Sequence, residues 1–157
     1  MHAVARRPPR ASGFSLLEML LVLALIAAAT ALAATAMTGG ITGLRLRAGA
    51  KEIAAQLRYT RAQALATGEA QRFVIDPRAH TWRAPRDHHG EVPRSLGVAF
   101  IGARETQPSR GEGAIVFFPD GASTGGRVQL SAKRAAWNVD VAWLTGEVRI
   151  ARAEAQQ

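Results

Sequence analysis

The hydrophobic pattern divides the chain into three stretches. Residues 14–37 are almost entirely apolar and contain one charged residue, Glu18. Over residues 44–67 apolar side chains return at every third or fourth position, the period of a helix with one buried face. After Gly68 short apolar runs alternate with turn residues, as in β-strands. The sequence therefore predicts an α+β fold, in which a long N-terminal helix, first transmembrane and then amphipathic, packs on antiparallel β-sheets.

The apolar stretch 14–37 is long enough to cross a membrane. As a helix it extends about 36 Å, against roughly 30 Å for the hydrocarbon core of a bilayer. Arg6, Arg7 and Arg10 precede it. The positive-inside rule therefore places the N-terminus in the cytoplasm and the rest of the chain on the other side of the membrane.

A secretory signal peptide is the alternative interpretation of the same stretch. Ala34-Thr35-Ala36 fits a signal-peptide cleavage site loosely. However, the apolar run exceeds the roughly 7–15 residues that are usual in such signals. Glu18 lies inside its first turns, where a carboxylate is costly near lipid and has no use in a signal peptide.

The second stretch, residues 38–68, continues as an amphipathic helix. Gly39, Gly40 and Gly43 interrupt the helical pattern, so we expect a bend or softening there. Gly68 is the expected C-cap. The apolar face that we expect to lie on a sheet consists of Leu46, Ala50, Ile53, Leu57 and either Ala64 or Leu65.

The last stretch reads as a series of short strands. We expect strands at residues 72–75, 80–83, 98–101, 114–118, 127–131, 137–143 and 147–150, with the first two forming a hairpin and residues 85–95 forming a loop. Alternation in the sixth strand places Trp137, Val139, Val141 and Trp143 on one face, which we assign to the core. Thr145-Gly146 is then a tight turn into the last strand.

Composition and motifs indicate no catalytic or metal chemistry. The formal net charge is +8, but the arginines are spread along the chain and are read as solvated surface. The absence of cysteine excludes disulfides and thiol chemistry. His88 and His89 adjoin in a loop without further ligands, and the glycines of 121–126 lack the pattern of a phosphate-binding loop. We therefore predict no enzyme, no metal and no cofactor.

The N-terminal motif Ser12-Gly13-Phe14-Ser15-Leu16-Leu17-Glu18 resembles the type IV prepilin processing signal. The resemblance implies that a prepilin peptidase in the membrane removes a leader, residues 1–13, by cutting after Gly13, and then methylates the new N-terminal amine of Phe14. It also implies that Glu18 pairs with the amine of Phe14 in a neighbouring subunit and sets the register of packed helices. An intramembrane carboxylate needs such a partner.

The C-terminal stretch, residues 69–157, resembles the periplasmic β-rich domain of the GspH/FimT family. The resemblance rests on residues 117–126, FFPDGASTGG, and residues 141–148, VAWLTGEV. It implies a minor pseudopilin of a type II secretion system, held in the bacterial inner membrane by a single span with its C-terminal domain in the periplasm. The implied partners are the prepilin peptidase, other major and minor pseudopilins near the tip of the pseudopilus, the inner membrane and secreted cargo.

Two other functions stay open on the sequence. One is a FimT-like minor pilin that binds DNA for uptake, since a basic patch suffices for phosphate contacts. Its candidate anion contacts are Arg127, Lys133, Arg134, Arg149 and Arg152, opposed by Asp140 and Glu147. The other is a singly spanning membrane protein that is neither cleaved nor assembled.

Overall fold

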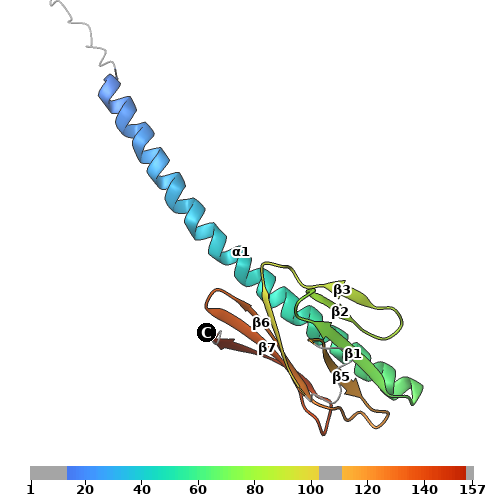
Figure 1. Cartoon of the computed structure of the whole chain (residues 1–157). Coiled ribbons are helices and arrows are strands. Elements are labelled where there is room, and N and C mark those ends of the chain that lie inside the picture. Colours follow the sequence, from blue (N-terminus) through green and yellow to red (C-terminus); the bar gives the residue numbers. More distant parts are fainter. Residues whose placement is uncertain (1–13, 103–110, 155–157) are drawn as a thin grey trace, which may run out of the picture. The chain divides into compact units, whose positions relative to one another are not determined.

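The computed structural model describes residues 14–102 and 111–154, and within them the backbone alone for residues 34–40. It contains one long helix, α1 (Leu16–Thr67), and two four-stranded antiparallel sheets (Figure 1). The predicted α+β class is confirmed. The chain forms two compact units, Met1–Gly39 and Gly40–Gln157, which we describe one at a time. We call the second unit the head domain.

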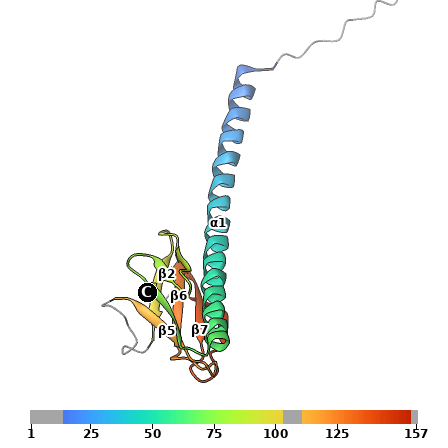
Figure 2. The same cartoon turned by 90° about the vertical axis from the view of Figure 1, so that its right-hand side faces the viewer.

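Within the residues that the structure describes, the first unit is formed mainly by the N-terminal part of α1 (Figure 2). The helical segment Leu16–Ala33 is long enough and apolar enough to cross a membrane. None of it is buried within the chain. The helix is continuous through Gly39, Gly40 and Gly43. These glycines interrupt the sequence pattern without ending the helix, because glycine in a helix interior costs only about 1 kcal/mol.

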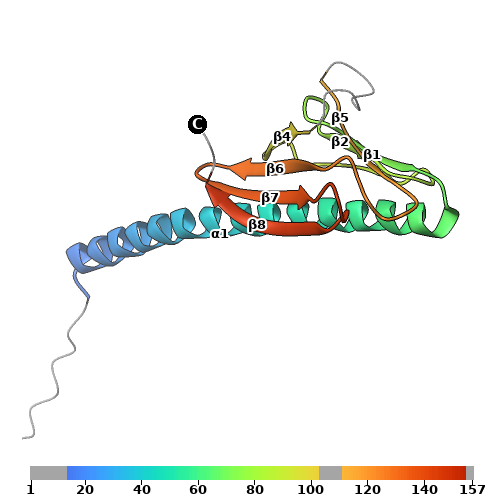
Figure 3. The same ribbon diagram turned by 90° about the horizontal axis from the view of Figure 1, so that it is seen from below.

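The head domain joins the second part of α1 to both sheets (Figure 3). All neighbouring strands are antiparallel. The first sheet has the order β3-β2-β1-β5, formed by β1 (Gln71–Asp76), β2 (Thr81–Arg83), β3 (His89–Glu91) and β5 (Gly113–Phe117). The second has the order β4-β6-β7-β8, formed by β4 (Gly97–Ile101), β6 (Gly126–Ala132), β7 (Ala135–Val141) and β8 (Val148–Glu154).

One hydrophobic core lies between the helix and the two sheets. The helix contributes the predicted face, Leu46, Ala50, Ile53, Leu57 and Ala64, all of which are buried, whereas Leu65 is 49% exposed. The first sheet contributes Phe73 and Ile115, and the second contributes Val128 and Val139. Each large apolar side chain stabilises the fold by about 1.5–3 kcal/mol when fully buried, so this shared core holds the sheets to the helix.

Two predicted turns are confirmed. Gly68 ends α1 with a φ of 70°, and its N–H donates to the carbonyl oxygen of Ala64 at 3.1 Å, an αL C-cap. The β1–β2 hairpin turns at Asp76, whose Oδ1 accepts hydrogen bonds from the backbone N–H groups of Arg78 and Ala79 at 2.8 and 2.9 Å.

Two predictions about the strands are wrong. Residues 85–95 include a short strand, β3, which pairs with β2 and places Gly90 against the ring of Trp82. Trp143 lies outside β7 and is 70% exposed, although its alternation with Val141 is that of a core position. The chain leaves the sheet at Ala142, because the N–H of Gly146 donates to the Ala142 carbonyl and closes a turn.

Candidate functional site

The start of α1 carries the two described residues of the predicted processing and assembly motif. Phe14 is 75% exposed, and Glu18 is exposed in the first turn of the helix. Gly13 lies outside the described residues. Ser15 is the N-cap, since its Oγ accepts a hydrogen bond from the N–H of Leu17 at 3.2 Å.

Ser15 and Glu18 have the spacing of a capping box, which the sequence analysis missed. In this S-x-x-E pattern the residue at the third helical position returns a hydrogen bond to the N-cap backbone. Glu18 occupies that position, three residues after Ser15. The S-x-x-E spacing therefore suits Glu18 to the local helix start, apart from the predicted intersubunit pairing, and it is visible in the sequence.

The structure separates the five candidate anion contacts into two groups along the second sheet. Arg127 and Lys133 are six residues apart on or next to β6, which corresponds to about 20 Å of strand. Arg127 and Arg149 lie at one end, on either side of Asp140 in register. Lys133 and Arg134 lie at the other end, in the β6–β7 turn, and Arg152 lies opposite Trp137, between the two ends, where it borders the same groove as Arg134.

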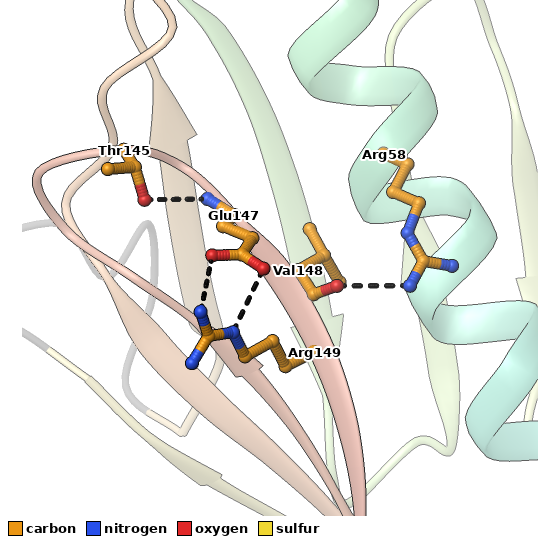
Figure 4. A network of polar contacts seen from close by, with 5 residues as sticks. All are labelled: Arg58, Thr145, Glu147, Val148 and Arg149. Atoms are coloured by element: carbon orange, nitrogen blue, oxygen red, sulfur yellow. Dashed lines mark hydrogen bonds and ion pairs between the residues drawn. The ribbon is translucent and has the colours of Figure 1, made fainter.

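The first group is neutralised by acidic neighbours. Arg127 pairs with Asp140, and Arg149 donates two hydrogen bonds to the carboxylate of Glu147 at 2.9 and 2.8 Å (Figure 4). These bonds from Arg149 hold the pKa of Glu147 below its ordinary value. The two arginines are therefore poor candidates for phosphate contacts, because each already has a carboxylate partner.

The second group is exposed and has no such partners. Lys133, with a φ of 54°, and Arg134 form the tip of the β6–β7 turn, and Arg152 is exposed on β8. None of the three takes part in an ion pair within residues 14–102 and 111–154. Arg134 and Arg152 border an open groove of about 470 Å³ that also touches Glu154.

The end of the head domain that contains Arg127 has an exposed apolar surface. Ile101, Trp143 and Leu144 are 62%, 70% and 67% exposed. Ile101 and Trp143 border a groove of about 510 Å³ together with Thr124, Gly125 and Arg127. Exposed large side chains in one region are typical of protein contact surfaces. The sequence analysis missed this surface because it assigned Trp143 to the core.

Two long-range hydrogen bonds fix the turns of this end on α1. Arg61 donates from Nε to the carbonyl oxygen of Gly121 at 3.1 Å, and Arg58 donates from Nη2 to that of Val148 at 3.0 Å (Figure 4). The two family-like segments, 117–126 and 141–148, thus meet beside the last turns of the helix. The polar residues and glycines of these two segments therefore hold the turns in their observed conformation.

The predicted histidine loop lies on the opposite sheet. His88 stacks on Tyr59 of α1, with ring centroids 4.4 Å apart, and His89 faces the backbone of Asp87. No cluster of three or more metal-binding side chains occurs in the described parts of the chain.

Comparison with known proteins places these features in one family. The profile described as "Type II transport protein GspH" matches residues 49–146, which include most of the head domain. The chain belongs to the GspH family. A second profile, "Prokaryotic N-terminal methylation motif", matches residues 8–34, the segment that contains the motif similar to the prepilin processing signal.

A curated relative and two solved structures agree with this family. Type II secretion system protein H of Xanthomonas campestris pv. campestris is 62% identical over 146 residues, covering 93% of this chain and 85% of the relative. The minor pseudopilin EpsH of Vibrio cholerae has a TM-score of 0.54 at 14% identity, over 68% of this chain and 96% of that one. The type IV minor pilin FimU of Pseudomonas aeruginosa has a TM-score of 0.53 at 12% identity, over 71% and 98%. The two solved structures share the fold.

Proposed function

We propose that this GspH-family chain is a minor pseudopilin of a type II secretion system, a filament subunit without catalytic activity. The observation that carries the proposal is the 62% identity to a type II secretion system protein H across nearly the whole chain. The fold alone does not choose between secretion and pilus systems, since EpsH and FimU match almost equally well.

Processing and assembly follow from the N-terminal motif. The peptidase cuts after Gly13 and methylates Phe14, and the freed amine of Phe14 in one subunit pairs with Glu18 of the next. The exposed apolar side chains of Leu16–Ala33 then pack against the helices of other major and minor pseudopilins. Small residues such as Ala27, Ala28 and Ala29 let these helices approach closely.

The proposed location is the inner membrane, with the head domain in the periplasm. Arg6, Arg7 and Arg10 before the span favour a cytoplasmic N-terminus, but Arg45, Arg47 and Lys51 follow it closely and match them in number. The orientation is therefore not set by charge alone. Long folded domains are translocated largely regardless of charge, which accommodates these residues on the outer side.

The DNA-uptake alternative is less well supported. Binding to a phosphate backbone requires basic residues that act together. Arg127 and Arg149 are paired with carboxylates, and Lys133 and Arg134 lie at the other end of the sheet. In the proposed role, the exposed apolar end around Trp143 contacts neighbouring pseudopilins or secreted cargo.

The deciding experiment is mass spectrometry of the N-terminus of the protein isolated from membranes that contain the prepilin peptidase. We expect a chain that begins at N-methylated Phe14. A chain that begins after Ala36, or that retains residues 1–13, contradicts the pseudopilin proposal. Salt-dependent DNA binding by the same preparation would instead favour the DNA-uptake function.

A further inference from the structure

Basic side chains gather at the end of the head domain where the chain enters it. We call this surface the basic end and define it by Arg45, Arg47, Arg94, Lys133, Arg134 and Arg152, all of which are exposed. They come from the start of the head-domain helix, the loop before β4, the β6–β7 turn and β8. Residues far apart in the sequence thus contribute to one surface.

Contacts within the head domain place these elements together. The guanidinium of Arg47 lies 5.9 Å from the ring centroid of Trp137, and Trp137 is the cross-strand neighbour of Arg152. Gly49 packs against Leu96, which lies two residues after Arg94, and against Leu130 of β6. Both β6 and the start of β4 therefore reach the same turn of the helix as Arg47.

The basic end and the end that contains Arg127 differ in how their charges are paired. At the opposite end Arg61 is bound to a backbone carbonyl, and Arg127 and Arg149 are bound to carboxylates. No ion pair within the described residues involves any of the six basic-end side chains. Glu154, opposite Ala135 at the end of β8, is an acidic residue that borders this surface.

The position of the basic end in the chain indicates its ligand. Arg45 lies eight residues after residue 37, where the apolar stretch 14–37 ends. Basic residues that closely follow a span lie near the lipid headgroups and are attracted by those that are anionic. Anionic headgroups attract each such Lys or Arg by about 1 kcal/mol, so several exposed and unpaired cations here form a surface for lipid phosphates.

We propose that the basic end docks the head domain on the anionic phospholipid headgroups of the bilayer that holds the chain's own apolar segment. The inference rests on the membrane anchorage in the proposed function. Docking holds the unassembled subunit against the membrane. Incorporation into the pseudopilus then requires release of these contacts, so lipid charge sets how readily the subunit leaves the bilayer.

The test uses the full chain in lipid nanodiscs made of phosphatidylcholine alone or mixed with phosphatidylglycerol. Hydrogen–deuterium exchange of the peptide that contains Lys133 and Arg134 reports docking. We expect several-fold slower exchange with phosphatidylglycerol, and loss of this protection at high salt because the contacts are screened. Equal exchange in the two lipid compositions overturns the proposal.

A triple variant removes half of the basic end. Lys133→Gln, Arg134→Gln and Arg152→Gln together should weaken docking about a hundredfold, at roughly fivefold per charge. The matched control, Arg72→Gln, Arg127→Gln and Arg149→Gln, removes the same charge elsewhere on the head domain and should keep the protection. Equal loss in both variants means that net charge alone acts, which contradicts a defined surface. Unchanged exchange in β5, which contains none of the substitutions, verifies that each variant is folded.

The last part of the experiment distinguishes lipid binding from nucleic-acid binding. It also distinguishes failure of this inference from failure of the proposed function. A short DNA duplex is added to the phosphatidylcholine nanodiscs. Protection by the duplex as strong as that by phosphatidylglycerol assigns the surface to nucleic acid and overturns the proposal. The nanodiscs contain neither peptidase nor other pseudopilins, so failure of docking leaves the processing result untouched, and failure of processing leaves the docking result untouched.

Discussion

Arg58 of α1 donates a hydrogen bond from Nη2 to the backbone carbonyl oxygen of Val148, the first residue of β8, at 3.0 Å (Figure 4). β8 is an edge strand, and the carbonyl of Val148 points away from β7, where no further strand follows. An edge carbonyl that faces the helix needs a donor. Arg58 provides it and fastens the edge of the second sheet to the helix.

We therefore expect Arg58→Ala to destabilise the head domain. A hydrogen bond with a charged donor contributes about 1.5–3 kcal/mol, and partial exposure places this one near the lower bound. Lys51→Ala, at an exposed position two turns before Arg58 that takes part in no ion pair among the described residues, should change the free energy of unfolding by less than about 0.5 kcal/mol. Urea unfolding of both variants in detergent measures the difference, and equal effects would refute the anchoring role.

Gly146 should not tolerate a side chain. Its φ is 61°, and a Cβ atom there would lie 2.2 Å from the carbonyl oxygen of Gly121 and 2.9 Å from Nε of Arg61. Gly146→Ala must therefore displace the Gly121 turn and its bond from Arg61. We expect a loss of about 2 kcal/mol or more in the free energy of unfolding.

The matched control for Gly146 is Gly43→Ala in the helix. A Cβ atom at Gly43 has no neighbour within 4 Å. Alanine should therefore leave the stability unchanged or raise it by about 0.5–1 kcal/mol. Thermal unfolding of the two variants compares them directly. A Gly146→Ala protein as stable as the wild type would contradict the tight contact between the two turns.

The fold was predictable wherever the spacing of apolar residues along the chain matches the burial of their side chains. Leu46, Ala50, Ile53 and Leu57 were assigned to the buried face by their spacing alone, and the structure buries all four. Trp143 also fits a regular hydrophobic pattern, but its assignment to the core is wrong. Its exposure follows from a long-range hydrogen bond, since the N–H of Ser123 donates to the carbonyl oxygen of Trp143 and holds the chain away from β7.

The candidate site was predictable in composition and less so in arrangement. The sequence shows that Arg127, Arg149 and Lys133 are basic. It does not show that Arg127 faces a carboxylate across the sheet or that Arg149 lies beside one. The Arg127–Asp140 pairing depends on the register of β6 and β7, whereas Arg149 pairs with Glu147 two residues before it. Similarly, His89-Gly90-Glu91 lacks strand periodicity, and β3 forms because β2 and Trp82 supply its partner surface.

The stability of the β1–β2 hairpin should depend on acid pH. Hydrogen bonds from the backbone N–H groups of Ala79 and Arg78 hold the pKa of Asp76 below its ordinary value of 3.8. A lowered pKa in the folded state means that the carboxylate stabilises the protein above pH 3.8 and that this contribution is lost as the pH falls through the folded pKa.

Asp76→Asn tests this contribution, because asparagine keeps a turn-forming acceptor but does not titrate. We expect the variant to be less stable than the wild type at neutral pH and equally stable at the acid end of the titration. Thermal unfolding across this pH range measures the gap. A stability difference that stays constant with pH would show that the charge of Asp76 plays no part.

Gly13→Ala should block processing. The proposed cut follows Gly13, where the absent side chain lets a membrane protease approach the backbone. We expect the variant to insert normally and to accumulate with residues 1–13 attached, as measured by mass of the intact protein from membranes that contain the peptidase. Ala11→Gly, two residues earlier, is the control and should be cleaved. Normal removal of residues 1–13 from Gly13→Ala would remove the main support for the cleavage motif.

Glu18 combines two roles that a pair of substitutions can separate. Its position three residues after Ser15 has the spacing of a capping box, a motif in which glutamine serves as well as glutamate. The proposed pairing with the amine of Phe14 in a neighbouring subunit needs the negative charge. Glu18→Gln therefore keeps the local helix start and removes the intersubunit attraction, whereas Glu18→Ala removes both.

We expect both variants to be inserted and cleaved, because neither change makes the span more polar. Both should enter filaments poorly, since an unpaired amine in an apolar helix bundle is costly. Shearing of assembled pseudopili and detection of this subunit in the sheared fraction measures incorporation. If Glu18→Gln assembles like the wild type while Glu18→Ala does not, then the carboxylate acts only through its own helix, because the capping role survives in glutamine and the charge does not.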